Sequence, residues 1–244
     1  MSKHLGASPV PGLTIEWPSP FPGRIRRVIS RSGAHRRYVV ACYRHGDLEA
    51  HADATEEASA FALLDACAGV EFQEQPARLK FDWLDGQHEH VPDILVATGA
   101  RSEFWECKRS SEADGFWIRK RSERMRELLL PLGVGYRVVT GDVLHRGSFL
   151  ANAQILRRFA KHVVAVSASS EATARTCAAG EIVLSRLASF LSGEEPIADV
   201  LALVYAGTLC ADLRAPLTAH TPIRLPSTEE ERPWVWQLFD AASA

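Results

Sequence analysis

Two acidic residues and one lysine stand in and beside two short apolar runs, at a spacing that suits metal-assisted hydrolysis of a phosphodiester. Asp93 follows a proline and opens the run that ends at Thr98, whereas Glu106 and Lys108 close the run that begins at Glu103. Carboxylate oxygens are the ligands that Mg²⁺ prefers in proteins. A lysine beside them can orient a water, help to deprotonate it, or stabilise the charge that grows on a phosphate.

The elements expected to position these groups are the two strands of a β-hairpin. The runs 93–98 and 103–108 are joined by a short glycine-containing turn, which predicts a hairpin. Side chains two residues apart in a strand point to one face, so Glu106 and Lys108 should share a face and meet Asp93 at one end of the hairpin. The short pattern is common, and an ordinary hairpin with a surface acid and a surface lysine would also produce it.

A helix predicted over residues 55–66 offers further carboxylates. Thr55 is a suitable N-cap, and Glu56 and Glu57 follow in the first turn, where acids stabilise the helix dipole. The residues four and seven positions after Glu57 are apolar, so Glu57 stands at the end of a buried stripe and Glu56 lies off it. Glu57 is then a candidate metal ligand or orienting carboxylate; the alternative is that both acids only stabilise the helix.

Two groups of basic residues are candidates for contacts with a polyanion. Residues 24–45 contain seven arginines and no acid, which fits a solvated face, a strand with outward arginines, or a phosphate-binding patch. A helix predicted from Gly115 to Leu130 carries further cations. The residues expected to contact the DNA backbone are Arg36, Arg37, Arg119, Lys120 and Arg124.

The composition limits the class of protein. A chain of 244 residues with 46% hydrophobic and 24% charged residues is expected to be soluble and globular, with one large domain or two small ones. The net charge of −2 confines nucleic-acid contacts to local patches. We find no apolar run of roughly 18 residues and no secretory signal, and hence expect no membrane segment. The five scattered cysteines lack a C-x-x-C pair, which favours reduced thiols and a cytoplasmic location.

The remaining strands and helices indicate an α/β layout. Alternating residues predict strands at 70–72 and 77–83, and the hydrophilic segment that carries His88 and His90 is expected to be an exposed link without a metal. The apolar run 136–140 predicts a central strand buried on both faces. We also expect a helix at 153–161, a strand at 38–43, and an unpaired, proline-rich start to the chain.

We divide the chain into three parts. Residues 1–23 contain five prolines and are expected to form an irregular arm, which Trp17 and Phe21 pin to the surface. Residues 24–165 form the α/β domain, and residues 166–244 form a smaller domain that follows a serine-rich linker at 167–170.

The smaller domain resembles a winged-helix unit. Helices are predicted at 181–191 and 197–203, and an extended ribbon at 217–225 follows them. Such units bind DNA or dock to proteins, and the acidic run 229–231 favours docking. The aromatic tail 234–239 has two readings, because it can anchor a partner or fold back on the core.

Taken together, these features resemble the TnsA family, the endonuclease subunits of heteromeric, Tn7-like transposases in the PD-(D/E)xK nuclease superfamily. The acidic helix, a Glu-Gln-Pro element that ends at Pro76, the Pro-Asp strand and the Glu-x-Lys strand occur in the family's order over residues 35–145. The resemblance implies a restriction-endonuclease-like mixed sheet flanked by helices, with a winged-helix-like C-terminal domain. Gln75 belongs to the Glu-Gln-Pro element, and we interpret its role as structural.

The resemblance also implies a set of site residues. Asp93 would be the central metal ligand, Glu106 the acid of the last motif and Lys108 the catalytic lysine. Glu57 would match the helix glutamate, with Glu56 as the other candidate, because Ala54 stands where family members tend to have a serine. The implied cofactor is Mg²⁺, for which Mn²⁺ can substitute.

The activity that the resemblance implies is cleavage of one DNA strand at transposon ends. Double-stranded DNA, a DDE-type transposase and an AAA+ ATPase regulator are the implied partners. Three alternatives stay open: a stand-alone PD-(D/E)xK nuclease of restriction or repair, a non-catalytic DNA-binding or assembly module, and a winged-helix regulator with a ligand-sensing domain.

Overall fold

The computed structural model describes residues 10–19, 23–25, 38–46, 48–84, 86–99, 101–226 and 234–240. The chain is a mixed α/β protein, as predicted, and it divides into two compact units. Unit 1 comprises Met1–Val40, Glu49–Ala60 and Val70–Val143, and unit 2 comprises Ala41–Leu48, Phe61–Gly69 and Leu144–Ala244. The domain boundary expected at residue 165 falls inside unit 2.

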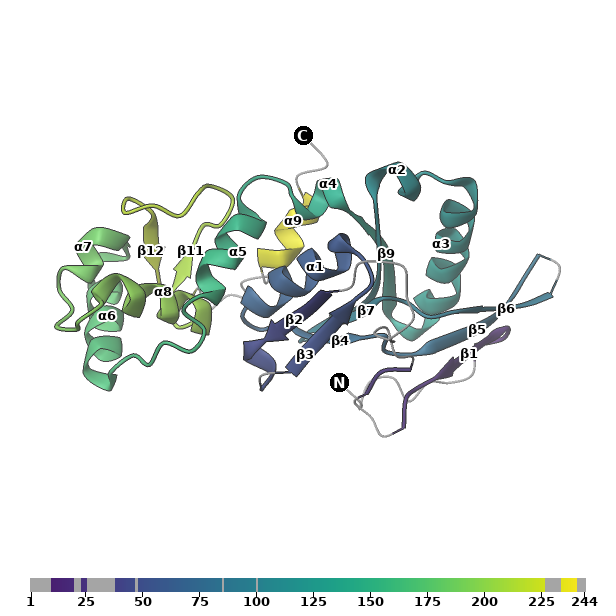
Figure 1. The fold of residues 1–244 in the computed structure, drawn as a ribbon, viewed down its shortest axis with the longest axis horizontal. Helices are drawn as coiled ribbons and strands as arrows, with labels where there is room; N and C mark the ends of the chain where they lie inside the picture. The colour runs from purple at the N-terminus through teal and green to yellow at the C-terminus, as the bar shows by residue number, and fades with distance from the viewer. Residues whose placement is uncertain are drawn as a thin grey trace. The chain divides into compact units, whose positions relative to one another are not determined.

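The main sheet of unit 1 has the strand order β4-β7-β8-β9 (Figure 1). β4 and β8 run antiparallel to β7, whereas β9 runs parallel to β8, so the sheet is mixed. β9 lies at the edge of this sheet, and the prediction of a central strand was wrong. Its buried residues are Val134, Tyr136 and Val139, and the other four residues are partly exposed. The strands are β4 (Glu71–Glu74), β7 (Ile94–Thr98), β8 (Arg101–Lys108) and β9 (Val134–Thr140).

The predicted hairpin is formed by β7 and β8. Ile94 is paired with Trp105, and Thr98 is paired with Arg101, so the loop between the strands has two residues. One of them, Gly99, has a φ of 48°, a left-handed conformation that glycine adopts without strain. The turn chemistry and the apolar runs were therefore sufficient to predict this part of the fold.

A second sheet of unit 1 has the order β1-β5-β6, with β5 and β6 forming a long hairpin (Figure 1). β1 lies in the segment predicted to be an irregular arm, so that prediction was wrong for these residues. Leu13 and Ile15 alternate with polar neighbours and pack against the hydrophobic core, as does Trp17, which stacks on Phe104 at 6.4 Å. Phe21 lies outside the described residues. The strands are β1 (Leu13–Glu16), β5 (Arg78–Trp83) and β6 (Gly86–His90).

The core of unit 1 joins the two sheets to the longest helix of this unit. Phe81 of β5, Phe104 of β8 and Met125 of the helix α3 are buried in one cluster. α3 begins after Gly115, as predicted, and its buried residues recur at intervals of three and four. The helical elements after β8 are α2 (Ser110–Ala113), α3 (Phe116–Leu129), the 3₁₀ turn η2 (Leu130–Leu132) and α4 (Gly141–Leu144).

The helix predicted at residues 55–66 is α1 (Thr55–Ala66). The amide of Ala58 donates to the carbonyl of Ala54, so Ala54 rather than Thr55 occupies the cap position. The Thr55 hydroxyl lies 3.0 Å from the hydroxyl of Tyr38. β2 (Tyr38–Cys42), which was predicted, pairs with β3 (Leu48–Ala52), and the 3₁₀ turn η1 (Tyr43–His45) lies between them in the chain.

Unit 2 contains helices and a small antiparallel sheet with the order β10-β12-β11. The serine-rich stretch 167–170 lies within α6 and is no linker; Ala168 and Ala172, one turn apart, form its buried stripe. The helix predicted at 153–161 begins earlier, at Phe149, where the buried stripe starts. The elements are α5 (Phe149–Arg157), α6 (Val166–Ala179), β10 (Glu181–Val183), α7 (Leu184–Ala188), α8 (Pro196–Ala206), β11 (Cys210–Ala211) and β12 (Pro222–Arg224).

The aromatic tail folds back on its own unit. It forms the 3₁₀ turn η3 (Trp234–Trp236) and the short helix α9 (Gln237–Asp240). Trp236 is buried, and Trp234 stacks on Phe149 with the ring centroids 5.5 Å apart. The acidic run 229–231 lies outside the described residues.

Two expectations from composition concern cysteines and membranes. All five cysteines are described, and all are free thiols. Among the helices that the structure describes, none combines the length and the apolar character that crossing a bilayer requires.

A buried carboxylate holds together several elements of unit 2. Asp65 of α1 is fully buried and accepts hydrogen bonds from the amide of Arg44 at 3.0 Å and from Nε of Arg157 at 2.9 Å. The hydroxyl of Tyr205 lies 3.4 Å from the same carboxylate. Removing such a carboxylate leaves buried donors and a buried cation without their partner, which is far more costly than losing a surface pair.

We therefore expect Asp65→Ala to lower the free energy of unfolding by about 3–5 kcal/mol, measured by urea denaturation with circular dichroism. The matched control is Asp212→Ala, because Asp212 forms an exposed ion pair with Arg214 at 2.6 Å. Its loss should cost less than about 1 kcal/mol. Equal effects of the two substitutions would contradict the structural role of Asp65.

Candidate active site

The backbone holds Asp93 at the start of the hairpin. Its amide donates to the carbonyl of Trp105 at 3.1 Å, which continues the pairing of β7 with β8. Its carboxylate Oδ2 accepts a hydrogen bond from the amide of Cys107 at 2.8 Å, and its carbonyl accepts one from the amide of Gln75 at 2.8 Å. Asp93 is buried, and these bonds fix both its backbone and its carboxylate against β8.

Gln75 lies where the chain turns from β4 towards β5. It is buried and has a φ of 42°, a left-handed conformation that residues other than glycine seldom adopt. The hydrogen bond to Asp93 helps to hold that conformation. This contact fits the structural role that we assigned to Gln75 from the sequence.

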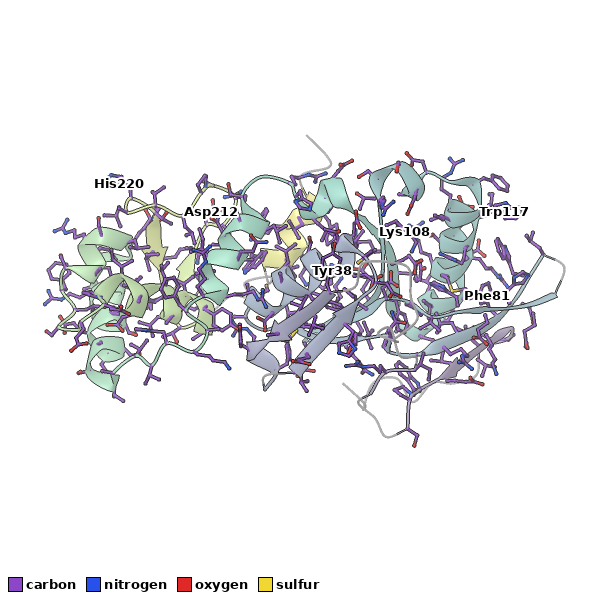
Figure 2. The ribbon with its side chains drawn as sticks, in the orientation of Figure 1. Tyr38, Phe81, Lys108, Trp117, Asp212 and His220 are labelled. Atoms are coloured by element: carbon purple, nitrogen blue, oxygen red, sulfur yellow. The ribbon has the colours of Figure 1, made fainter. Side chains whose placement is uncertain are left out.

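Glu106 and Lys108 share one face of β8, as predicted. Nζ of Lys108, which is labelled in Figure 2, lies 2.8 Å from Oε1 of Glu106. The same oxygen accepts a hydrogen bond from Nη2 of Arg121, in α3, at 2.9 Å. Glu106 is 3% exposed, so two cations compensate a carboxylate that is almost completely removed from water.

The other oxygen of Glu106 faces a histidine. Oε2 lies 3.0 Å from Nε2 of His90, but it has no hydrogen-bond partner among the described residues. The imidazole nitrogen instead forms a hydrogen bond of 2.9 Å with the hydroxyl of Tyr136. The expectation that His90 lies in an exposed link was wrong, because His90 is the last residue of β6 and faces inwards, paired with the buried Leu79. His88 is partly exposed in the same strand.

Glu57 comes to the site from α1. It is buried, whereas Glu56 is partly exposed. One oxygen of Glu57 accepts a hydrogen bond from the amide of Asp53 at 3.1 Å, which stabilises the start of the helix. The charge of Glu57 raises the pKa of Asp93 and that of Cys107. The geometry thus brings Glu57 rather than Glu56 to the other acids.

The pKa of Asp93 is raised by its buried, negatively charged surroundings. Burial raises the pKa of Asp93 well above its ordinary value, and the charges of Glu106 and Glu57 raise it further. Lys108 and the amide of Cys107 oppose this effect without cancelling it. Asp93 is therefore inclined to hold a proton unless another positive charge enters the site.

For Glu106 and Lys108, unlike Asp93, the neighbouring charges outweigh the effect of burial on the pKa. Burial alone would raise the pKa of Glu106, but His90, Lys108 and Arg121 together lower it below its ordinary value. Burial alone would lower the pKa of Lys108, but the charges of Glu106 and Asp93 raise it. These contacts favour the anionic form of Glu106 and the ammonium form of Lys108, which donates hydrogen bonds.

The carboxylates of the candidate site are chemically suited to bind a divalent cation. The buried Oε2 of Glu106, which faces His90 at 3.0 Å, and the mutually repelling carboxylates are groups that an oxygen-binding cation would satisfy. Among the described residues, however, no group of three acids, histidines or cysteines has a ready-made metal-binding arrangement. Asp93, Glu106 and Glu57 are the residues that would hold the ion.

Sequence reasoning missed the partners that come from other elements. Arg121 was seen only as one cation of a basic helix, and Tyr136 only as part of a strand. The signal for Arg121 was its position four residues before the buried Met125, on the inward stripe of α3. The signal for His90 was its alternation with Glu89, which places His88 and His90 on the same face of the strand.

The predicted DNA contacts are only partly described. Arg36 and Arg37 lie outside the described residues. In α3, Arg119 is exposed, Lys120 pairs with Glu123 at 2.8 Å, and Arg124 donates to the carbonyl of Asp82 at 3.2 Å. Arg24 and Arg44, from the arginine-rich stretch, are engaged within their own units, Arg24 with Glu74 and Arg44 with Asp65.

Comparison with protein-family models found no match for this chain, and comparison with curated proteins found none either. The inference about function therefore rests on the residues of the site.

The raised pKa of Asp93 predicts a dependence of stability on pH. The folded protein keeps a proton on Asp93 at pH values at which the unfolded chain has lost it, so stability falls as the pH rises from 3.8 through the raised value. Asp93→Asn removes this penalty and keeps an acceptor for the amide of Cys107. In EDTA at mildly alkaline pH we expect the variant to have the higher Tm, by a few degrees, in differential scanning fluorimetry.

Two controls make this measurement specific. The difference in Tm should shrink as the pH approaches 3.8, and Asp114→Asn, at an exposed position, should not reproduce it. Mn²⁺ should raise the Tm of the wild type but not that of Asp93→Asn. A variant that is less stable than the wild type in EDTA would contradict the electrostatic account of the site.

Proposed function

We propose that this chain is a metal-dependent DNA endonuclease, a TnsA-like subunit of a heteromeric transposase that cleaves one strand at transposon ends. The observation that carries the proposal is the convergence of Asp93, Glu106 and Lys108 at one end of a hairpin, with Glu57 entering from a helix. Acids that compete for a positive charge beside a protonated lysine suit hydrolysis of a phosphodiester.

The two units are consistent with this proposal. The mixed sheet of unit 1, with its acids at the end of β7 and β8, supports a restriction-endonuclease-like core. Unit 2 has the element order α6, β10, α7, α8, β11, β12, in which β12 lies between the other two strands. Three helices and a three-stranded sheet in this order support a winged-helix-like domain.

The chemistry divides between the ion and the protein. A bound Mg²⁺ would polarise a phosphate oxygen and lower the pKa of an attacking water. Lys108 remains protonated, so its role is to donate a hydrogen bond to the water or to the phosphate and to stabilise developing negative charge. Arg121 and Lys108 both contact Oε1 of Glu106, whereas Oε2 faces His90.

DNA would be held by cations outside the site. Arg119, Lys120 and Arg124 extend along α3, the helix that also supplies Arg121. Backbone contacts of this kind give affinity without sequence preference, so the choice of site falls to partner proteins. A DDE-type transposase and an AAA+ ATPase regulator are the partners that this function requires.

We expect Asp93→Ala and Lys108→Ala each to lower Mg²⁺-dependent cleavage of supercoiled plasmid by about a hundredfold or more, since each removes a group that stabilises the transition state. Asp93→Ala should still bind DNA. Cleavage is measured on agarose gels, with and without the DDE transposase encoded nearby.

Matched controls are Glu194→Ala and Lys161→Ala, at exposed positions of unit 2, which should cleave as the wild type does. Full cleavage by Asp93→Ala would contradict the assignment of Asp93 to the active site. Cleavage by the wild type without any partner would favour a stand-alone nuclease. No cleavage even with the partner present would favour a non-catalytic assembly module.

The salt dependence of DNA binding tests the role of α3. Arg119→Ala should reduce the slope of log Kd against log salt concentration by about one, because one phosphate contact is lost. Fluorescence anisotropy with a labelled duplex at several KCl concentrations measures this slope. Arg175→Ala is the control, since its guanidinium is paired with Glu171 at 2.7 Å in unit 2. An unchanged slope for Arg119→Ala would remove α3 from the DNA contact.

A further inference from the structure

An exposed group of aromatic side chains lies at the start of α3 and the end of β5. Phe116 and Trp117 are 55% and 63% exposed, respectively, although large aromatic residues are normally buried. Their rings are 5.1 Å apart, and the ring of Trp117 lies 6.0 Å from that of Trp83 at nearly a right angle. We call Trp83, Phe116 and Trp117 the aromatic platform; Trp117 is labelled in Figure 2.

Trp83 of the platform is held in place by two aromatic neighbours. Trp83 contacts His88 in an edge-to-face arrangement at 5.3 Å and lies 6.2 Å from Phe81, which belongs to the hydrophobic core. Aromatic pairs of this kind stabilise a fixed geometry. Trp117 therefore rests on a rigid support while its own ring stays in contact with solvent.

The platform lies next to the candidate active site. Trp117 is four residues before Arg121 in α3, so the two side chains occupy the same stripe, one turn or about 5.4 Å apart along the axis. Arg121 contacts Glu106 at 2.9 Å. A polymer whose reacting phosphate lies at Glu106 must therefore run close to the start of α3.

The helix that carries Trp117 is basic, since α3 has five cations and two acids. An open hollow of about 670 Å³ beside the platform is lined by Trp83, Lys120 and Arg124, and by the acid Asp82. Glu123 and Glu127 also line it and pair with these cations at the surface. Exposed pairs of this kind contribute little to stability, so a phosphate can displace the acids. Rings beside cations favour a nucleic acid as the ligand over an apolar protein surface.

We propose that the aromatic platform stacks on a nucleotide base that is unpaired beside the scissile phosphate. The proposal deepens the proposed function, on which it rests. In a closed duplex the faces of the bases are covered by their neighbours, so a ring can stack only where the helix has been opened. The chain would accordingly prefer DNA that is distorted at the point of cleavage over a fully paired duplex.

The test compares two fluorescein-labelled substrates, a fully paired duplex and the same duplex with a few central mismatches. Dissociation constants are measured by fluorescence anisotropy in EDTA. The wild type should bind the mismatched substrate about tenfold more tightly, as expected for stacking on a base. Trp117→Ala should lose this preference and keep its affinity for the paired duplex.

Two further variants separate stacking from folding. Trp117→Phe keeps an aromatic ring and should keep most of the preference. Leu130→Ala removes a side chain that is 76% exposed at the other end of the helix, and should bind both substrates as the wild type does. Circular dichroism checks that each variant is folded.

Three outcomes would overturn the proposal: equal affinity of the wild type for both substrates, an unchanged preference in Trp117→Ala, or a change of oligomeric state in Trp117→Ala with no effect on DNA binding. The last outcome would assign the platform to a protein contact. These results are independent of cleavage. A preference that depends on Trp117, in a protein that never cleaves DNA, would support stacking and reject the nuclease.

Discussion

Burial and like-charge repulsion act together on three buried carboxylates of unit 1, those of Asp93, Glu106 and Glu57. Desolvation and like-charge repulsion both oppose such a group. Each acid is held by a different device: Asp93 by a backbone amide of β8, Glu57 by the amide of Asp53, and Glu106 by Lys108 and Arg121. The sheet register, the start of α1 and the position of α3 are therefore linked through the acids that they support.

The positive charges compensate the three acids unevenly, and the remaining negative charge would attract a further cation. Glu106 has two cations on one oxygen, and its pKa is lowered, whereas Asp93 has a raised pKa and bears the repulsion. A site neutralised at every acid would be more stable, but it would offer no attraction to a further cation. The excess of negative charge here opposes stability.

What the sequence allowed us to predict was local. Asp93, Glu106 and Lys108 lie in two strands joined by a short turn, so spacing and alternation were enough to predict their shared end and face. α1 and α3 were likewise predicted from their own periodicity. His90 and Arg121 reach Glu106 from β6 and α3. The periodicity of each element can place these side chains on an inward face, but that both meet Glu106 depends on how the elements pack.

The same limit explains the errors elsewhere. β1 was taken for an irregular arm because prolines dominate the composition of its surroundings, yet Leu13 and Ile15 alternate towards the core once β5 is present to pair with them. The serines of α6 are typical of a linker, but the segment forms a helix because Ala168 and Ala172 are buried. In both cases tertiary contacts outweighed local propensity.

α3 shows how one helix can join the core, the charges and the surface. Met125 and Leu128 pack inwards, Arg121 one turn earlier holds Glu106, and Trp117 one turn before that faces solvent. These residues lie on one stripe, so a shift of one residue in the register of the helix would turn all of them by about 100°. The packing of the core thus fixes the direction of Arg121, and with it the place of Trp117 beside the candidate site. A change in the core beneath α3 would therefore disturb the site without touching any of its acids.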